Sequence, residues 1–143
     1  LPLVRRLVEA ARGKSVTFHR AFDLCRDPFE AIGQLMDLGI ERLLTSGQAP
    51  TALMGVELLT GLVEKAGDRL SVMPGGGVSV TNAAEILRES GAHEIHASAR
   101  EPIASAMRFR RDDVSMGAAG SDEYACLSTS ANIVKQIVSA ITE

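Results

Sequence analysis

The side chains that could carry chemistry in this sequence gather in four short motifs. The candidates are His19, Arg20 and Asp23, then Thr45, Ser46 and Gly47, then Gly75, Gly76 and Gly77, and finally His96, Ser98 and Arg100. Imidazole and carboxylate groups can move protons, whereas arginine and glycine N–H groups can hold an anion. We therefore expect a pocket where His19 or His96 acts as acid or base with Asp23 orienting it. The other nine residues would bind a small anionic ligand.

The glycine run is the most informative of these motifs. It follows an apolar run at 70–73 and precedes a predicted helix start at 79–82. A glycine turn before a helix exposes backbone N–H groups to an anion. The run lacks the Gly-Lys-Ser/Thr ending of a P-loop and the spacing of a dinucleotide-binding loop. The alternative for the glycine run is a tight turn that needs positive φ. Arg20 and Asp23 also have a simpler alternative, in which they pair only with each other.

Soft metal ligands are scattered along the chain. Cu(I) prefers thiolate, thioether or imidazole ligands. Those present are Cys25, Cys126, Met36, Met54, Met73, Met107, Met116, His19, His93 and His96. Cys25, just past His19, is the metal candidate we retain, against the more common alternative of a bystander thiol. The two cysteines form no metal-type pair and fit a reducing compartment such as the cytoplasm.

The elements that position these motifs alternate between strands and helices. Strands are predicted at 15–20, 42–46, 70–74 and 94–98. Helices are predicted at 3–11, from 28 to a stop at Gly39, from 51 or 55 to 66, at 79–90 and at 130–142. Asp27, Pro28 and Glu30 have the order of a capping box at the start of the second helix.

Strict alternation of strands and helices predicts a parallel sheet. A doubly wound sheet and part of a (β/α)₈ barrel both fit this pattern. In the first predicted strand, Val16 and Phe18 alternate with Thr17 and His19, and the stretch 94–98 alternates in the same way. A strand covered on both faces would be continuously apolar. The alternation therefore favours a partial α/β barrel of the TIM type, with its chemistry at the carboxyl ends of the strands.

The composition limits the class of protein. The chain has 143 residues, 45% of them hydrophobic, which suffices for one domain over residues 1–143. A net charge of −3 and 3% aromatic residues argue against nucleic-acid binding. No apolar run is long enough to span a membrane and no signal peptide is visible, so we expect no membrane partner.

Five motifs together resemble the copper homeostasis protein CutC family. They are TFHRAFD at 17–23, LTSG at 44–47, MPGGG at 73–77, EIHASAR at 94–100 and SMG at 115–117. They come in the family's order and extend along the whole chain. The resemblance implies a TIM-type (β/α)₈ barrel, a cytosolic location, and binding and handling of Cu(I). It also implies a homo-oligomer when the protein is full length.

The resemblance also places the predicted strand at 15–20 as the fifth of the barrel. The chain would then hold about the second half, strands five to eight, with the first four upstream of Leu1. The absence of an initiator Met and the helical pattern at the start lead to the same expectation. The family's Cu(I)-linked cysteines belong to the early strands, and neither Cys25 nor Cys126 matches them. Copper as a cofactor is therefore implied by the resemblance alone.

Two classes of function remain open. The first, which we prefer, is a copper-handling protein without catalysis. The alternative is a TIM-barrel enzyme, whose phosphate site would use the loops after strands seven and eight. The resemblance places the glycine run at strand seven and the stretch 96–100 at strand eight. His19 or His96 would then be the acid or base.

Overall fold

A computed structural model of the chain describes residues 2–111, 113–114 and 124–142. The predicted motif at 115–117, with Met116, lies outside the described residues. The helices are α1 (Pro2–Ala10), α2 (Pro28–Asp37), α3 (Val56–Ala66), α4 (Ala83–Ser90) and α5 (Ala131–Thr142), with short 3-10 helices η1 (Arg20–Leu24) and η2 (Gly67–Arg69). The strands are β1 (Thr17–Phe18), β2 (Arg42–Thr45), β3 (Ser71–Pro74), β4 (Arg100–Ala104) and β5 (Ala125–Thr129).

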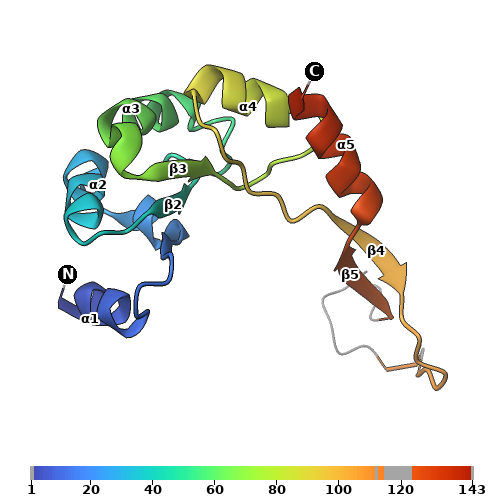
Figure 1. Cartoon of the computed structure of the whole chain (residues 1–143). Coiled ribbons are helices and arrows are strands. Elements are labelled where there is room, and N and C mark those ends of the chain that lie inside the picture. Colours follow the sequence, from blue (N-terminus) through green and yellow to red (C-terminus); the bar gives the residue numbers. More distant parts are fainter. Residues whose placement is uncertain (1, 112, 115–123, 143) are drawn as a thin grey trace.

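A parallel sheet of three strands in the order β1-β2-β3 forms the centre of the fold. Thr17 is in register with Arg42, and Arg42 with Ser71. A single parallel bridge between Gly75 and His96 extends the sheet beyond β3. The predicted parallel sheet in sequential order is therefore confirmed for these three strands. Figure 1 shows an arch, with α2, α3 and α4 on its convex side and β2 and β3 on its concave side.

Burial alternates along the strands because one face of the sheet meets the helices. The buried strand positions are Leu43, Thr45, Val72 and Pro74. They face a core shared with α2 and α3, in which Ile32 and Leu59 are completely buried. Intervening positions such as Leu44 and Met73 face the concave side and are half-buried. This one-sided cover agrees with a barrel wall, whereas the partial barrel of strands five to eight remains a prediction.

The first predicted strand, at 15–20, is too long. β1 covers only Thr17–Phe18, and η1 begins at Arg20. The side chain of His19 caps η1, because its Nδ1 accepts a hydrogen bond from the backbone N of Ala21 at 3.0 Å. This local bond turns the chain into a helical path where the sequence predicted further strand.

The fourth predicted strand, at 94–98, is wrong as a regular strand. Within the described residues only His96 bridges to the sheet. Ala99 then adopts a positive φ of 46°, and the chain continues into β4, which pairs antiparallel with β5. This hairpin was not predicted. Pro102 lies within β4, and proline is tolerated there because β4 pairs with one strand only among the described residues.

One helix start also differs from the prediction. α4 begins at Ala83 rather than at 79, whereas α3 begins at Val56 with Gly55 as its N-cap, in agreement with the predicted start at 55. Asn82 Oδ1 accepts from the backbone N of Ser79 at 2.8 Å, and Asn82 Nδ2 donates to the carbonyl of Gly77 at 2.9 Å. Both bonds hold residues 77–82 as a loop. The predicted cap of α2 is confirmed, with Asp27 Oδ1 accepting from the first turn.

None of the helices in residues 2–111 and 124–142 is long and apolar enough to cross a membrane.

Candidate functional site

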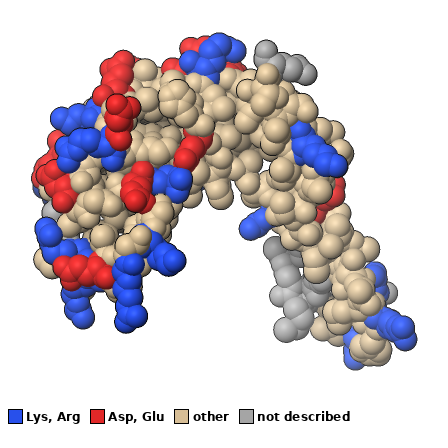
Figure 2. Space-filling view, in the orientation of Figure 1, with Lys and Arg blue, Asp and Glu red and all other residues tan. Residues whose placement is uncertain are grey.

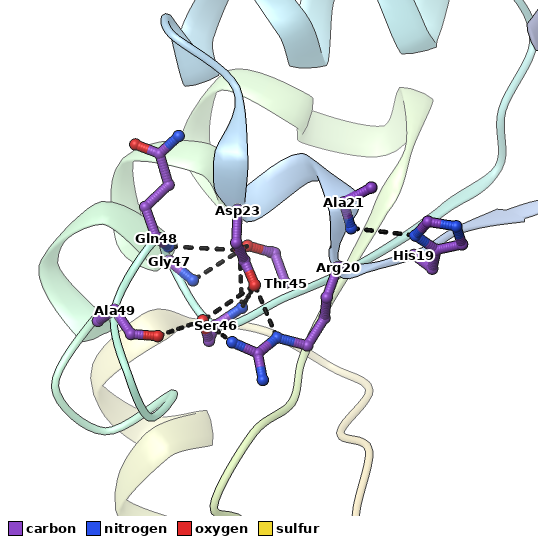
Figure 3. A network of polar contacts seen from close by, with 9 residues as sticks. All are labelled: His19, Arg20, Ala21, Asp23, Thr45, Ser46, Gly47, Gln48 and Ala49. Carbon is purple, nitrogen blue, oxygen red and sulfur yellow. Dashed lines mark hydrogen bonds and ion pairs between the residues drawn. The ribbon is translucent and has the colours of Figure 1, made fainter.

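The carboxylate of Asp23 is the centre of a polar network at the carboxyl end of β2 (Figure 3). Asp23 comes from η1, and its side chain is 8% exposed. Oδ1 accepts from the hydroxyl of Thr45 at 2.5 Å and from the backbone N of Gln48 at 3.3 Å. Oδ2 accepts from Arg20 Nε at 2.7 Å, and both oxygens lie within 3.2 Å of the backbone N of Ser46. The carboxylate is therefore fully bonded in one orientation.

These bonds keep Asp23 ionised. Partial burial alone would raise the pKa of its carboxyl, but hydrogen bonds from Thr45, Arg20 and Ser46 outweigh burial and lower the pKa below its usual value. Within the described part of the chain no hydrogen bond joins Asp23 to His19 or His96. The carboxylate instead fixes Arg20 and the turn after β2.

The Ser46 hydroxyl links Arg20 to the same turn. Its Oγ accepts from Arg20 Nη2 at 2.7 Å and lies 3.0 Å from Asp23 Oδ2 and 2.6 Å from the carbonyl of Ala49. The single hydroxyl hydrogen goes to one of these two oxygens. Two nitrogens of Arg20 are thus occupied, and Nη1 has no hydrogen-bond partner among the described residues.

Arg20 Nη1 lies against the glycine run. A Cβ atom built on Gly76, whose φ is +113°, would stand 2.8 Å from this nitrogen. A Cβ on the neighbouring Gly75 would meet Leu44 Cδ1 at 2.5 Å and His96 Cβ at 3.2 Å. The run therefore consists of glycine because neighbouring side chains fill the space around Gly75 and Gly76, and because Gly76 and Gly77 both have positive φ, as the alternative of a tight turn predicted.

The carbonyls of Gly76 and Gly77 are hydrogen-bonded, and Gly75 donates its N–H to the carbonyl of Thr45 at 2.9 Å. The carbonyl of Gly76 accepts from Ala52 N at 2.8 Å, and that of Gly77 from Asn82 Nδ2 at 2.9 Å. The parallel bridge between Gly75 and His96 directs Gly76 N–H at the carbonyl of His96, whereas Gly77 N–H has no acceptor among the residues that the structure describes. Because the C=O of Gly76 and the N–H of Gly77 belong to one planar peptide and point in opposite directions, the bond from Ala52 fixes where Gly77 N–H points. An oriented backbone N–H near an arginine can hold an anion.

His19 and His96 both lie at the carboxyl end of the sheet, and no hydrogen bond joins them. His19 stacks on Phe18, with ring centroids 5.6 Å apart, and points away from the Asp23 network in Figure 3. The bond from Ala21 to its Nδ1 assigns the hydrogen of the neutral ring to Nε2. His96 donates its backbone N–H to the carbonyl of Pro74 at 2.9 Å, and its side chain is exposed.

Of the remaining candidates, Gly47 belongs to the turn after β2, and Ser98 and Arg100 lie apart from the Asp23 network. Gly47 donates its N–H to Thr45 Oγ1 at 3.0 Å and packs against the backbone of Gly55, where no side chain fits. Ser98 is exposed and accepts from Thr129 through its carbonyl at 3.2 Å. Arg100 is exposed on β4, in register with Thr129 of the hairpin. Among the described residues, no hydrogen bond joins Ser98 or Arg100 to the Asp23 network.

The structure gives no support for a Cu(I) site among the described residues. No group of three or more His, Cys, Asp or Glu residues in the described part of the chain is arranged to hold a metal. Burial and the nearby charge of Asp27 raise the pKa of Cys25, which disfavours the thiolate form that binds metal. Its Sγ instead accepts from Gln48 Nε2 at 3.4 Å. Cys126 is exposed on β5, opposite Ile103.

Gln48, Ala49 and Asn82 belong to the site's framework and were missed by the sequence analysis. Asn82 had a signal, since asparagine before a helix often bonds the preceding loop. No signal in the sequence indicates the contacts of Gln48 and Ala49, because these contacts depend on the turn after β2 folding back on η1.

Comparison with known proteins gives one consistent family. A family model described as "CutC family" matches residues 1–101. A Chromobacterium violaceum protein named family protein CutC is 51% identical over 137 residues, covering 96% of this chain and 56% of the relative. A Bacteroides fragilis protein of the same name is 46% identical over 143 residues, covering 99% of this chain and 57% of the relative. The chain thus spans a little over half the length of the curated relatives it matches.

A solved structure agrees with these sequence matches. The crystal structure of a Streptococcus agalactiae protein, provisionally named copper homeostasis protein CutC, superposes with a TM-score of 0.62 at 33% identity. The match covers 65% of this chain and 46% of that protein. The sequence matches and this structural neighbour therefore point to the same family.

Proposed function

The chain belongs to the CutC family, and from that membership we propose that it takes part in copper homeostasis as a cytoplasmic protein that handles Cu(I). The observation that carries this proposal is the family match over residues 1–101, which includes the first four motifs. The provisional name of the Streptococcus agalactiae neighbour supplies the link to copper homeostasis. A homo-oligomeric full-length protein is part of the same proposal.

The metal itself would be held elsewhere than in the residues described here. Soft-metal sites need converging thiolate, thioether or imidazole ligands, and among the described residues the sulfur of Cys25 has a hydrogen bond from Gln48 alone. We therefore place the Cu(I) ligands in the portion of the family's length that has no counterpart in this chain. In this assignment, the present chain contributes part of the barrel wall and the carboxyl ends of its strands next to the metal site.

An anaerobic Cu(I) competition titration tests this proposal. The full-length Bacteroides fragilis relative should bind Cu(I) tightly, and the 143-residue chain should bind it weakly, with no change on Cys25→Ser. A full-length relative that fails to compete for Cu(I) would overturn the copper role. Tight one-to-one binding by this chain that Cys25→Ser abolishes would instead make Cys25 the site.

A second candidate function is an enzyme of the TIM-barrel type with an anion site at the glycine run. The observation favouring it is the position of Arg20 Nη1 beside Gly76, next to Gly77 N–H, which has no acceptor among the described residues. Asp23 neutralises part of the charge of Arg20 but also fixes its orientation. A phosphate or carboxylate would receive charge-assisted hydrogen bonds there. His19 or His96 would be the acid or base.

Titration with inorganic phosphate, followed by amide NMR, tests the anion site. We expect shifts of the Gly76 and Gly77 amides that saturate, and their loss in Arg20→Gln. Arg69→Gln is the matched control, because Arg69 is an exposed arginine paired with Asp37 at 3.0 Å. Arg100→Gln tests whether Arg100 contributes. Amides that stay unshifted at high phosphate concentration would overturn the anion site.

A further inference from the structure

The imidazole of His96 lies beside the same glycine run that Arg20 contacts. A Cβ atom built on Gly75 would stand 3.5 Å from His96 Cδ2, an atom of the ring. A Cβ atom built on the next residue, Gly76, would stand 2.8 Å from Arg20 Nη1. Because consecutive Cα atoms are only about 3.8 Å apart, the two side chains flank one short piece of backbone.

The two side chains approach the glycine run from the same face of the sheet. The Cβ atom built on Gly75 would also meet Leu44 Cδ1 at 2.5 Å, and the one built on Gly76 would meet Ser46 Cβ at 3.4 Å. Leu44 and Ser46 are two residues apart along the path of β2, and residues two apart along a strand share a face. The guanidinium and the imidazole can therefore contact one ligand.

Both side chains have polar atoms available for such a ligand. Arg20 Nη1 and the two ring nitrogens of His96 have no hydrogen-bond partner among the described residues. The backbone of His96 is fixed, because its N–H donates to the carbonyl of Pro74 at 2.9 Å. His19 differs, since its Nδ1 already accepts from the N–H of Ala21. His96 is thus the histidine that is placed to act together with Arg20.

The carboxylates nearest to His96 are already paired. Asp23 of η1 bonds Arg20 at 2.7 Å, and Glu94 forms an ion pair with Arg42 of β2. β3 and the loop between it and α4 contain no charged residue. The charged residues on β4 and α5 are all exposed and are Arg100, Glu101 and Lys135. Asp23 and Glu94 are therefore not free to neutralise a charged imidazole, and an anionic ligand can do so.

The overall charge of the chain does not favour anions. The net charge is −3, and Figure 2 shows Lys and Arg side chains mixed with Asp and Glu over the face in view. Attraction of an anion to the glycine run therefore depends on the local donors, which are Arg20, the N–H of Gly77 and His96.

We propose that the anion site of the second candidate function, on which this inference rests, takes a doubly charged oxyanion and that His96 binds it as the imidazolium. The pair of Arg20 and Asp23 has no net charge. Protonation of His96 adds a positive charge and an N–H donor, so the cluster gains most from an ion that carries two negative charges. The ligand class is a phosphate group, either free or on a small organic ester. Binding is therefore accompanied by uptake of a proton and strengthens as the pH falls.

Sulfate titrations at about pH 7.5 and about pH 5.5, followed at the Gly77 amide by NMR, test this inference on the 143-residue chain. Histidine changes its charge between about pH 5 and pH 8. Sulfate keeps both charges over this range, whereas a phosphate group gains a proton within it. Asp23 stays ionised, because its hydrogen bonds lower the pKa of its carboxyl. We expect sulfate to bind about fivefold more tightly at the lower pH, as for one exposed ion pair.

Three variants assign the pH dependence. His96→Gln should bind sulfate equally at both pH values and as weakly as wild type does at the higher one. His96→Lys carries a permanent charge and should bind sulfate tightly at both. His93→Gln is the matched control, because His93 is also an exposed histidine of the same stretch, and it should keep the wild-type pH dependence.

The anion site and the role of His96 can fail separately. If Arg20→Gln abolishes sulfate binding but His96→Gln keeps the wild-type pH dependence, the anion site stands and the role of His96 is wrong. Equal binding by wild type at both pH values would also overturn the inference. A wild-type Gly77 amide that shifts with neither sulfate nor phosphate would overturn the anion site itself.

The two sources of a phosphate group are distinguished by comparing inorganic phosphate with glycerol phosphate at one pH. Tighter binding of glycerol phosphate would assign the site to an organic ester, whose carbon chain could lie on the side chain of Leu44 next to Gly75. Equal or weaker binding of the ester would assign it to free phosphate. In both cases, His96→Gln should weaken binding at about pH 5.5 by the same factor as for sulfate.

Discussion

The guanidinium of Arg20 lies against the backbone of Gly76, so that a Cβ atom built on Gly76 would stand 2.8 Å from Nη1. Asp23 holds the same guanidinium at Nε, and Ser46 holds it at Nη2. The side chain of Arg20 therefore connects η1, the turn after β2 and the loop after β3. Its position depends on the absence of a side chain at Gly76.

Gly76→Ala should displace Arg20 and lower the stability of the fold. The new methyl group would clash with Nη1, and φ of +113° is unfavourable for alanine. The expected loss in free energy of unfolding is about 2 kcal/mol. Urea unfolding at a fixed protein concentration measures it. Phosphate binding at the loop should weaken in the same variant.

Gly13→Ala is the control for backbone strain alone. Gly13 also has a positive φ of 75°, but nothing lies within 4 Å of a Cβ atom built there. This change should cost about 1 kcal/mol and leave phosphate binding unchanged. Equal effects of the two changes on both measurements would show that the contact with Arg20 does not matter.

Stability should depend on the ionisation of Asp23 at acidic pH. The carboxyl has a pKa below its usual value of 3.8, so the unfolded chain takes up a proton at a higher pH than the folded chain does. The stabilisation is therefore complete above a pH of about 4 to 5 and is lost as the pH falls through the lowered pKa. Urea midpoints from about pH 7 to pH 3 should fall more steeply for wild type than for Asp23→Asn.

Two variants separate this effect from general acid unfolding. Asp23→Asn should cost about 2 kcal/mol at neutral pH, because a nearly buried charged acceptor is lost. Glu64→Gln, on the exposed side of α3, should retain the wild-type pH dependence. The hypothesis fails if wild type and Asp23→Asn lose stability in parallel as the solution is acidified.

The local features of this fold could be predicted from the sequence because they depend on neighbours in the chain. Asp27 followed by Pro28 begins a helix, and the carboxylate accepts from the N–H groups of Phe29 and Glu30. β2 and β3 were predictable for a similar reason. Each has two adjacent apolar residues, Leu43 and Leu44 in β2 or Val72 and Met73 in β3, and a glycine within two residues of its end, which is typical of a short strand.

The features that the sequence did not predict depend on distant partners. The stretch 94–98 has the alternation of a strand, but a strand also needs neighbours, and among the described residues only Gly75 pairs with His96. β4 forms because β5 pairs with it, from Arg100 opposite Thr129 to Ala104 opposite Ala125. In the site, Asp23 bonds Thr45 and Ser46 rather than a histidine, because the ring of His19 is used to cap η1.

Gly55→Ala should be among the most destabilising single changes in this chain. A Cβ atom on Gly55 would overlap the carbonyl oxygen of Ser46 and lie 2.9 Å from that of Gly47. Backbone atoms cannot move aside as a side chain can, so the turn after β2 must shift. We expect a loss of about 3 kcal/mol, comparable with overpacking a core.

The control for this change is Gly33→Ala. Gly33 lies within α2, and nothing lies within 4 Å of a Cβ atom built there. Alanine should therefore stabilise the helix by about 0.5–1 kcal/mol. Thermal unfolding of both variants decides the matter, and a neutral Gly55→Ala would show that the turn after β2 adapts without cost.

Cys25 should react faster with an alkylating agent when the charge of Asp27 is removed. Burial and the charge of Asp27 raise the pKa of its thiol, so little of it is thiolate at neutral pH. Asp27→Asn removes the charge, and asparagine keeps the helix cap because it accepts the same backbone hydrogen bonds. The lower pKa should speed alkylation by iodoacetamide at about pH 8, measured by mass spectrometry in a Cys126→Ser background. Glu30→Gln removes a charge from the same helix turn, but Glu30 is not among the groups that shift the pKa of Cys25. It should leave the rate unchanged, and an equal acceleration by both changes would assign the effect to net charge rather than to the proximity of Asp27.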